Sequence, residues 1–249
     1  MSTIPDGSRP SGKPLRLLKA VPNKVYNRLI VRYPYQTDRD YALFYHESAS
    51  RLASTFEGRP MDDLILIPFL MLYRQAFELQ LKNFVRYLAK VRQDYHEPQN
   101  LDLDRDVIDT RLAREIGHNL AKLLNEVLTH YDALDLSERF PDSTNRLILM
   151  IHDADDRGTT FRYAGQMPAS HDRADFPDLV SLLNEEYTLL VAVEDWVDGI
   201  YSAVPTNSSE GTTLFLNHLR RVHRAVCPAR RRLISSRNPR ELGLRPTLS

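Results

Sequence analysis

Three charged side chains recur at intervals of four residues inside an otherwise apolar stretch, "PFLMLYRQAFELQLKNFVRYL", residues 68–88. They are Arg74, Glu78 and Lys82. Because four residues are slightly more than one helical turn, a helix places them in one row beside its core-facing positions. A carboxylate between two cations can form the inner wall of a polar site. The alternative is a surface ion pair between Glu78 and Lys82, worth roughly a few tenths of a kcal/mol.

His118 is the side chain outside this row that is best suited to chemistry. A histidine can accept and donate protons near neutral pH, so it is a candidate general acid or base. It precedes the apolar stretch "NLAKLL" and can equally be a structural residue that pairs with Glu78 and fixes the bundle. Four more polar residues lie next to apolar positions that are expected in the core: Lys122, Asp156, Arg162 and Tyr163. We therefore predict that they surround one cleft together with His118 and with the row of Arg74, Glu78 and Lys82.

The spacing of apolar residues predicts the helices that position these groups. Phe77, Leu81, Phe84 and Leu88 recur every three or four residues, which is typical of a buried helix face. Only 9 glycines and the long stretches without turn signals favour helices over sheet. We therefore predict an all-α fold, an up-and-down helical bundle. Its helices are expected at about 38–56, 62–91, 118–131, 140–155 and 176–204.

The regions between and beyond the helices differ in composition. Residues 95–109 are predicted to form a loop, and the alternating residues 160–163 predict a short strand or β-hairpin in a connector rich in turn residues. The Pro-, Ser- and Gly-rich residues 1–14 are predicted to be disordered. The chain is thus divided into this terminus, a helical domain at 15–205 and a basic extension at 206–249.

Charge is balanced over the whole chain, with 33 basic and 33 acidic residues, but it is unevenly distributed. From residue 220 onward there are nine arginines and one acid, which leaves 24 basic and 32 acidic residues in the rest of the chain. Such a tail can bind nucleic acid phosphates, fold back on the acidic body, or be only a solvated end. A charge run alone does not decide among these.

Other features bear on location. The single cysteine, Cys227, excludes an intrachain disulfide, and the N-terminal sequence lacks the apolar segment of a secretory signal, so we expect a cytoplasmic protein. The longest apolar run, from Leu64 to Leu72, is too short to span a bilayer, so no membrane association is expected.

Several chemistries lack their motifs. The sequence contains no Gly-rich phosphate loop, no Gly-x-Gly-x-x-Gly and no Gly-x-Ser-x-Gly. It has no His-Glu-x-x-His pair, and the acids around His152 form a solvated helix end more readily than a metal site. We therefore expect neither a metal nor another cofactor.

Three blocks of the chain resemble a known family. "LMLYRQAFELQLKNFV", "GHNLAKLL" and "DRGTTFRYAG", in this order between about residues 61 and 165, resemble the signature blocks of an uncharacterised group of HEPN-like helical proteins of bacteria. Two positions depart from that group's pattern. Gln75 stands where the group usually has His, and Ala164 stands where it has Pro after Phe-Arg-Tyr.

The resemblance implies a helical bundle, often a homodimer, in a superfamily that includes metal-independent RNases of toxin–antitoxin and phage-defence systems. Those nucleases share an Arg followed, after four to six residues, by His. Arg111 and His118 have six residues between them, whereas Arg114 and His118 have three. By this resemblance His118 would act as acid or base on RNA, and Arg111 or Arg114 would stabilise the charged phosphorane.

Three function classes follow. The first is an endoribonuclease with His118 and Arg111 or Arg114 at a dimer seam. The second is a non-catalytic HEPN-like module that uses the same cleft to bind a nucleotide, RNA or a protein partner encoded by a nearby gene. The third is a structural bundle whose polar residues fix the register of its helices.

Overall fold

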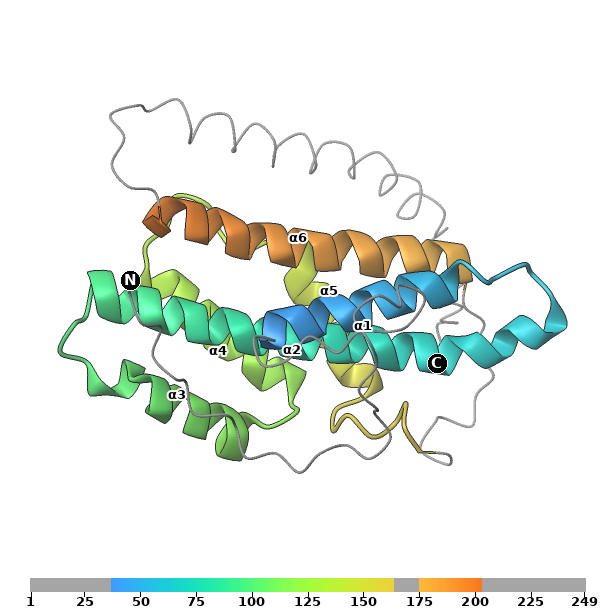
Figure 1. Ribbon diagram of the computed structural model, residues 1–249, viewed down its shortest axis with the longest axis horizontal. Coiled ribbons are helices and arrows are strands. Elements are labelled where there is room, and N and C mark those ends of the chain that lie inside the picture. Colours follow the sequence, from blue (N-terminus) through green and yellow to red (C-terminus); the bar gives the residue numbers. More distant parts are fainter. Residues whose placement is uncertain (1–36, 164–174, 203–249) are drawn as a thin grey trace, which may run out of the picture.

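The computed structural model describes residues 37–163 and 175–202, and the regular structure within these ranges is helical throughout (Figure 1). The prediction of an all-α helical bundle is therefore confirmed for this part of the chain. The long helices are α1 (Asp38–Ala53), α2 (Asp63–Tyr95), α4 (Leu120–Ala133), α5 (Asp142–Ala154) and α6 (Phe176–Ser202). Shorter elements are the 3-10 turns η1 (Pro60–Asp62) and η2 (Leu101–Leu103), helix α3 (Arg105–Arg111) and the π-helical turn η3 (Leu112–Ile116).

Side chains mark where two of the helices begin. Thr37 and Asp40 form a capping box at the start of α1, in which the Thr37 hydroxyl accepts from the Asp40 amide and the Asp40 carboxylate accepts from the Thr37 amide. At the start of α4, the Asn119 side chain accepts a hydrogen bond of 2.9 Å from the Lys122 amide. These bonds satisfy amides that have no partner within the helix. The Asn119 cap thereby fixes the segment that carries His118.

Helix α2 is the central element of the bundle. It packs most extensively against α1 and also against α4 and α6, and Figure 1 shows α1, α2 and α6 running along the long axis of the molecule. Phe77, Leu81, Phe84 and Leu88 are completely buried, as their spacing predicts. Because α2 is covered on several sides, polar residues on different faces of it can be enclosed by different partners.

The stretch Pro60–Tyr95 is the one helix in the described ranges that is long and apolar enough, by length and composition, to cross a membrane. A core helix of a globular bundle has the same properties. Here the buried residues of α2 are covered by other helices of the same chain. Its apolar character is therefore accounted for by the core of the bundle.

Two predictions of local structure were wrong. Residues 160–163 form a turn, not a strand, because the amides of Arg162 and Tyr163 bond back to the carbonyl of Thr159 at 3.0 and 3.1 Å. The predicted loop 95–109 contains η2 and the start of α3. The predicted N-terminal segment 1–14, the extension 206–249 and the rest of the connector, including Ala164, lie outside the described residues.

Candidate functional site

The row of charges on α2 is enclosed by the bundle. Glu78 accepts three hydrogen bonds of 2.8 Å: from Lys82 Nζ and His118 Nδ1 to its Oε1, and from Arg74 Nη1 to its Oε2. The Glu78 side chain is 1% exposed and that of Arg74 is 2% exposed. The alternative of a surface ion pair therefore does not describe these residues. They form a buried network, whose desolvation is offset only when every charge is paired and hydrogen-bonded.

Arg74 joins α2 to two other segments. Its Nη2 donates to the carbonyl of His118 at 2.7 Å, and its Nε lies 3.1 Å from Oδ2 of the buried Asp155, just past the end of α5. This second contact is an ion pair without hydrogen-bond geometry, since Oδ2 has no hydrogen-bond partner in the described part of the chain. Asp155 Oδ1 accepts from the amides of Thr159 and Thr160 at 2.7 and 2.9 Å. One guanidinium thus connects α2, the segment before α4 and the turn after α5.

Gly158 lets that turn approach the guanidinium. Its φ is +72°, and a Cβ built at this position would lie 2.8–3.0 Å from the terminal atoms of Arg74. Real Cβ atoms do not come that close to other heavy atoms, and residues with a Cβ rarely adopt this φ. Glycine at position 158 therefore satisfies both the conformation of the turn and the space left by Arg74.

His118 combines a buried partner with an exposed ring. Its side chain is 59% exposed, although its Nδ1 is bonded to the enclosed Glu78. Burial alone would raise the pKa of Glu78, but the bonds and charges of Lys82 and His118 outweigh it and hold that pKa below its ordinary value. Glu78 is therefore a carboxylate at neutral pH. It accepts the proton on Nδ1, which leaves Nε2 of the neutral ring as the basic nitrogen.

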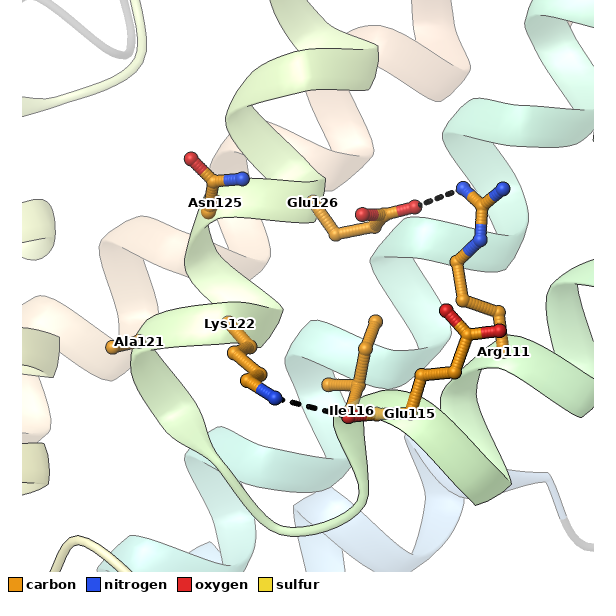
Figure 2. Close-up of a pocket in the computed structure, with 7 residues that line it drawn as sticks. All are labelled: Arg111, Glu115, Ile116, Ala121, Lys122, Asn125 and Glu126. Atoms are coloured by element: carbon orange, nitrogen blue, oxygen red, sulfur yellow. Dashed lines mark hydrogen bonds and ion pairs between the residues drawn. The ribbon is translucent and has the colours of Figure 1, made fainter.

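The two candidate arginines have different surroundings. Arg111 Nη1 donates to Glu126 Oε1 on α4 at 2.7 Å, whereas Arg114, in η3, is exposed and has no ion pair or hydrogen bond among the described residues. Lys122 is also exposed and donates to the carbonyl of Glu115 at 3.2 Å. An open surface pocket of about 560 Å³ lies between the α3–η3 segment and α4. Figure 2 shows Arg111 and Lys122 among the residues that line it.

The remaining predicted residues lie at the edge of the network or outside it. Arg162 Nη2 donates to Gln75 Oε1 at 3.1 Å, on the helix that carries the row of charges. Asp156 is exposed and is 3.8 Å from Arg157, and Tyr163 is 61% exposed. The structure therefore joins Arg74, Glu78, Lys82 and His118. It does not bring Arg111, Arg114, Lys122, Asp156 or Tyr163 into the same hydrogen-bonded cluster, because their side chains point to other partners or to solvent.

Asp155 and Gly158 are the residues of the network that the sequence interpretation missed. Both lie in "DADDRG", where an Asp followed by Gly within a few residues after a helix is a turn signal. In the described part of the chain, no group of three or more His, Cys, Asp or Glu side chains is arranged to hold a metal ion. The network is instead built from ion pairs between side chains of opposite charge.

Comparisons of this chain with protein-family models, with curated proteins and with solved structures find no match. The fold and the site together define an all-α bundle with a buried Arg–Glu–Lys–Asp network and an exposed, carboxylate-bound histidine. The chemistry of that network is therefore the basis for inferring the function of the protein.

Proposed function

We propose that this protein is a HEPN-like, metal-independent endoribonuclease of a bacterial toxin or phage-defence system, with His118 as its general acid or base. The observation that carries the proposal is the 2.8 Å bond between the exposed His118 ring and the buried carboxylate of Glu78. A buried carboxylate fixes the tautomer and direction of an imidazole, while exposure of the ring leaves its other nitrogen accessible to a substrate. The resemblance of the three sequence blocks to HEPN-like proteins supports RNA as that substrate.

In the proposed reaction, His118 Nε2 removes the proton of an RNA 2′-hydroxyl. The 2′-oxygen then forms a bond to the adjacent phosphorus, and the bond to the 5′-oxygen breaks. The imidazolium returns its proton to the leaving oxygen, so the products are a 2′,3′-cyclic phosphate and a 5′-hydroxyl. Glu78 is a positioning residue in this scheme, since its oxygens are occupied by Arg74, Lys82 and His118.

Charge develops on the phosphorane, and a cation beside it lowers the barrier. Of the two candidate arginines, we assign this role to Arg114, because its guanidinium has no ion pair in the described part of the chain and Arg111 is bound to Glu126. The homodimer that the resemblance implies belongs to the same proposal. It would place the His118 segments of two chains at one seam.

The test is cleavage of several RNAs by the purified monomer and dimer in the presence of EDTA. We expect His118→Ala to lower the rate by about 10²–10⁴-fold, the usual contribution of a general acid or base, while the melting temperature changes little. His96→Ala is the matched control, because His96 is also exposed and is bonded to Tyr201. Arg114→Ala should reduce cleavage, and Arg111→Ala should reduce it less.

A binding module is the second candidate, favoured by one observation: Arg111, which has the Arg-to-His spacing of the superfamily, is tied to Glu126. A module of this kind would bind a nucleotide or a protein partner at the same surface. If the wild-type protein cleaves RNA no faster than His118→Ala, the nuclease proposal is lost. If His118→Ala instead destabilises the fold by about 1–3 kcal/mol, His118 is a structural brace whose loss leaves Glu78 without one of its donors.

A further inference from the structure

A second polar site lies between α1 and α6, over the face of α2 that is turned away from Glu78. Gln80 follows Glu78 by two residues, so the two side chains leave the helix in very different directions. A groove of about 280 Å³ lies above Gln80, between side chains of α1 and α6. Figure 1 shows α1 and α6 next to each other along α2, and both helices contact α2. The groove is slightly smaller than most small-molecule sites, which measure roughly 300–1,000 Å³.

The floor of the groove holds a hydrogen-bond acceptor that lacks a donor. Gln80 is 0% exposed, and its Nε2 donates to Glu194 Oε2 at 2.5 Å. Its Oε1 therefore has to find a separate donor, but in the described part of the protein this buried atom has no partner. Leaving a buried acceptor unsatisfied costs its full desolvation free energy, so such atoms are rare in folded proteins. A ligand that supplies an N–H group to Oε1 would remove this cost.

The wall of the groove holds a second acceptor of the same kind. His46 Nε2 lies 2.8 Å from Asn184 Oδ1, an acceptor, so Nε2 carries the proton and Nδ1 is the bare nitrogen. Among the described residues, the buried Nδ1 has no hydrogen-bond partner, and a carboxylate oxygen of Glu47 is 4.0 Å away. The ring stacks on Tyr187 with 4.4 Å between centroids and 12° between planes. The stack holds Nδ1 in a fixed direction beside an apolar surface.

The charges at the groove favour a cation. Asp40 and Glu47 line it, and hydrogen bonds from Thr37 lower the pKa of Asp40, so that group is ionised. Arg39, the one Arg or Lys among the described residues that line it, is bound to Asp195 and lies 3.8 Å from Glu194. The positive charge of Arg39 is thus already neutralised by carboxylates. Two free acceptors and an excess of carboxylates are complementary to N–H donors that carry positive charge.

We propose that this groove binds a free small organic cation, a primary ammonium or guanidinium group on a short alkyl chain. The charged head donates to Gln80 Oε1 and His46 Nδ1, and the alkyl chain lies along the apolar parts of Leu43 and Val191. This proposal does not depend on the RNase proposal, because none of its residues belongs to the Glu78–His118 network.

The test is calorimetric titration of the full chain with agmatine, which has a guanidinium group and a primary ammonium group on a four-carbon chain. We expect saturable binding at one site and no binding of 1-pentanol, which has an alkyl chain of similar length and no charge. His46→Leu keeps the apolar contact with Tyr187 and removes the acceptor. It should lower the affinity for agmatine about tenfold or more. Glu47→Gln should weaken it about two- to fivefold, as expected for one partly exposed charge.

Glu115→Gln is the matched control, since it makes the same change of charge at the distant pocket of Figure 2 and should leave agmatine binding unchanged. N-acetyl-arginine methylamide, which represents an arginine side chain of a polypeptide, should bind more weakly than agmatine. Equal or tighter binding of that probe would overturn the assignment to a free cation. Absence of saturable binding, or equal affinity of the wild-type protein and His46→Leu, would overturn the site itself. Thermal melts of each variant establish that it is folded.

Discussion

Two buried glutamates belong to different faces of the bundle and have opposite surroundings. Glu78, on α2, is 1% exposed and is bonded to the cations Arg74 and Lys82 and to His118. Glu194, on α6, is 3% exposed and receives its hydrogen bonds from the neutral amides of Gln80 and Asn83. Both carboxylates are thus hydrogen-bonded on each oxygen, but Glu78 has three donors, among them two cations, whereas Glu194 has two neutral donors.

The difference appears in their proton affinities. Burial raises the pKa of Glu194 to about 7, because Arg39 and the two amides offset it only in part. Burial acts on Glu78 in the same direction, but there Lys82 and His118 outweigh it and the pKa is lowered. Hydrogen bonds from neutral groups therefore satisfy the geometry of a buried carboxylate without keeping it ionised. To keep a buried carboxylate ionised, full positive charges at contact distance are required.

The largest effect is expected when the charged network is broken at Arg74. Arg74→Met should destabilise the protein by about 3–5 kcal/mol, because it leaves Asp155 buried without its cation and takes one of the donors from Glu78. Arg114→Met removes an exposed arginine and should change the free energy of unfolding by less than about 0.5 kcal/mol. Urea denaturation at neutral pH measures both. A small loss for Arg74→Met would show that Lys82 and His118 alone maintain the network.

The second prediction concerns Glu194 and pH. Its pKa rises from 4.5 in the unfolded chain to about 7 in the folded protein, so between these values the unfolded state releases a proton that the folded state retains. Folding stability contributed by this group is therefore full below about pH 4.5 and falls as pH rises to about 7, by up to roughly 3 kcal/mol. Glu194→Gln should remove this fall.

Urea midpoints of the wild type and Glu194→Gln, measured across this range, give the difference curve. Glu78→Gln is the matched comparison with the opposite sign. Because the pKa of Glu78 is lowered, its contribution is present above its unfolded value and is lost as pH falls below it. For each variant, the difference in stability from the wild type is plotted against pH. If the curves for Glu194→Gln and Glu78→Gln had the same slope, the contrast between the two carboxylates would be contradicted.

The smallest predicted effect tests the turn that meets Arg74. Gly158→Ala should destabilise the fold by about 1–3 kcal/mol, since a Cβ would strain the backbone at φ +72° and displace the guanidinium. Gly199→Ala is its control within the same chain. Gly199 lies in α6, and apart from its own stretch of helix no described residue has an atom within 4 Å of an added Cβ, so alanine should stabilise the protein by about 0.5–1 kcal/mol. Thermal unfolding that shifts both variants downward would contradict the role given to Gly158.

The long helices could be predicted from the sequence because their apolar residues keep the helical period over several turns. Helix α3 could not be predicted in the same way. A seven-residue helix is unstable alone, and its sequence is rich in charges. Its packing residue Ile108 and the bond of 2.5 Å between Arg86 and Asp109 attach it to α2, and these contacts depend on the tertiary fold.

The candidate site was partly predictable for a similar reason. The spacing of Arg74, Glu78 and Lys82 fixes their common row, and His118 does contact that row. Which aspartate contacts this row of charges depends on the residue at which α5 ends. The helix stops at Ala154, so the next residue, Asp155, turns inward and Asp156 is exposed. Helix ends are uncertain by one or two residues in a sequence, and such a shift changes which side chain faces the core.

The contacts of Arg74 join segments that are far apart in the sequence, and this affects the rates of folding and unfolding. Its bonds to His118 and Asp155 connect residues separated by 44 and 81 positions. Contacts that close such long loops are costly in entropy before the rest of the core is in place, and they form late. Interactions that are absent from the transition state slow unfolding and leave the folding rate nearly unchanged. The Arg74 network should therefore lower the unfolding rate and lengthen the lifetime of the folded bundle.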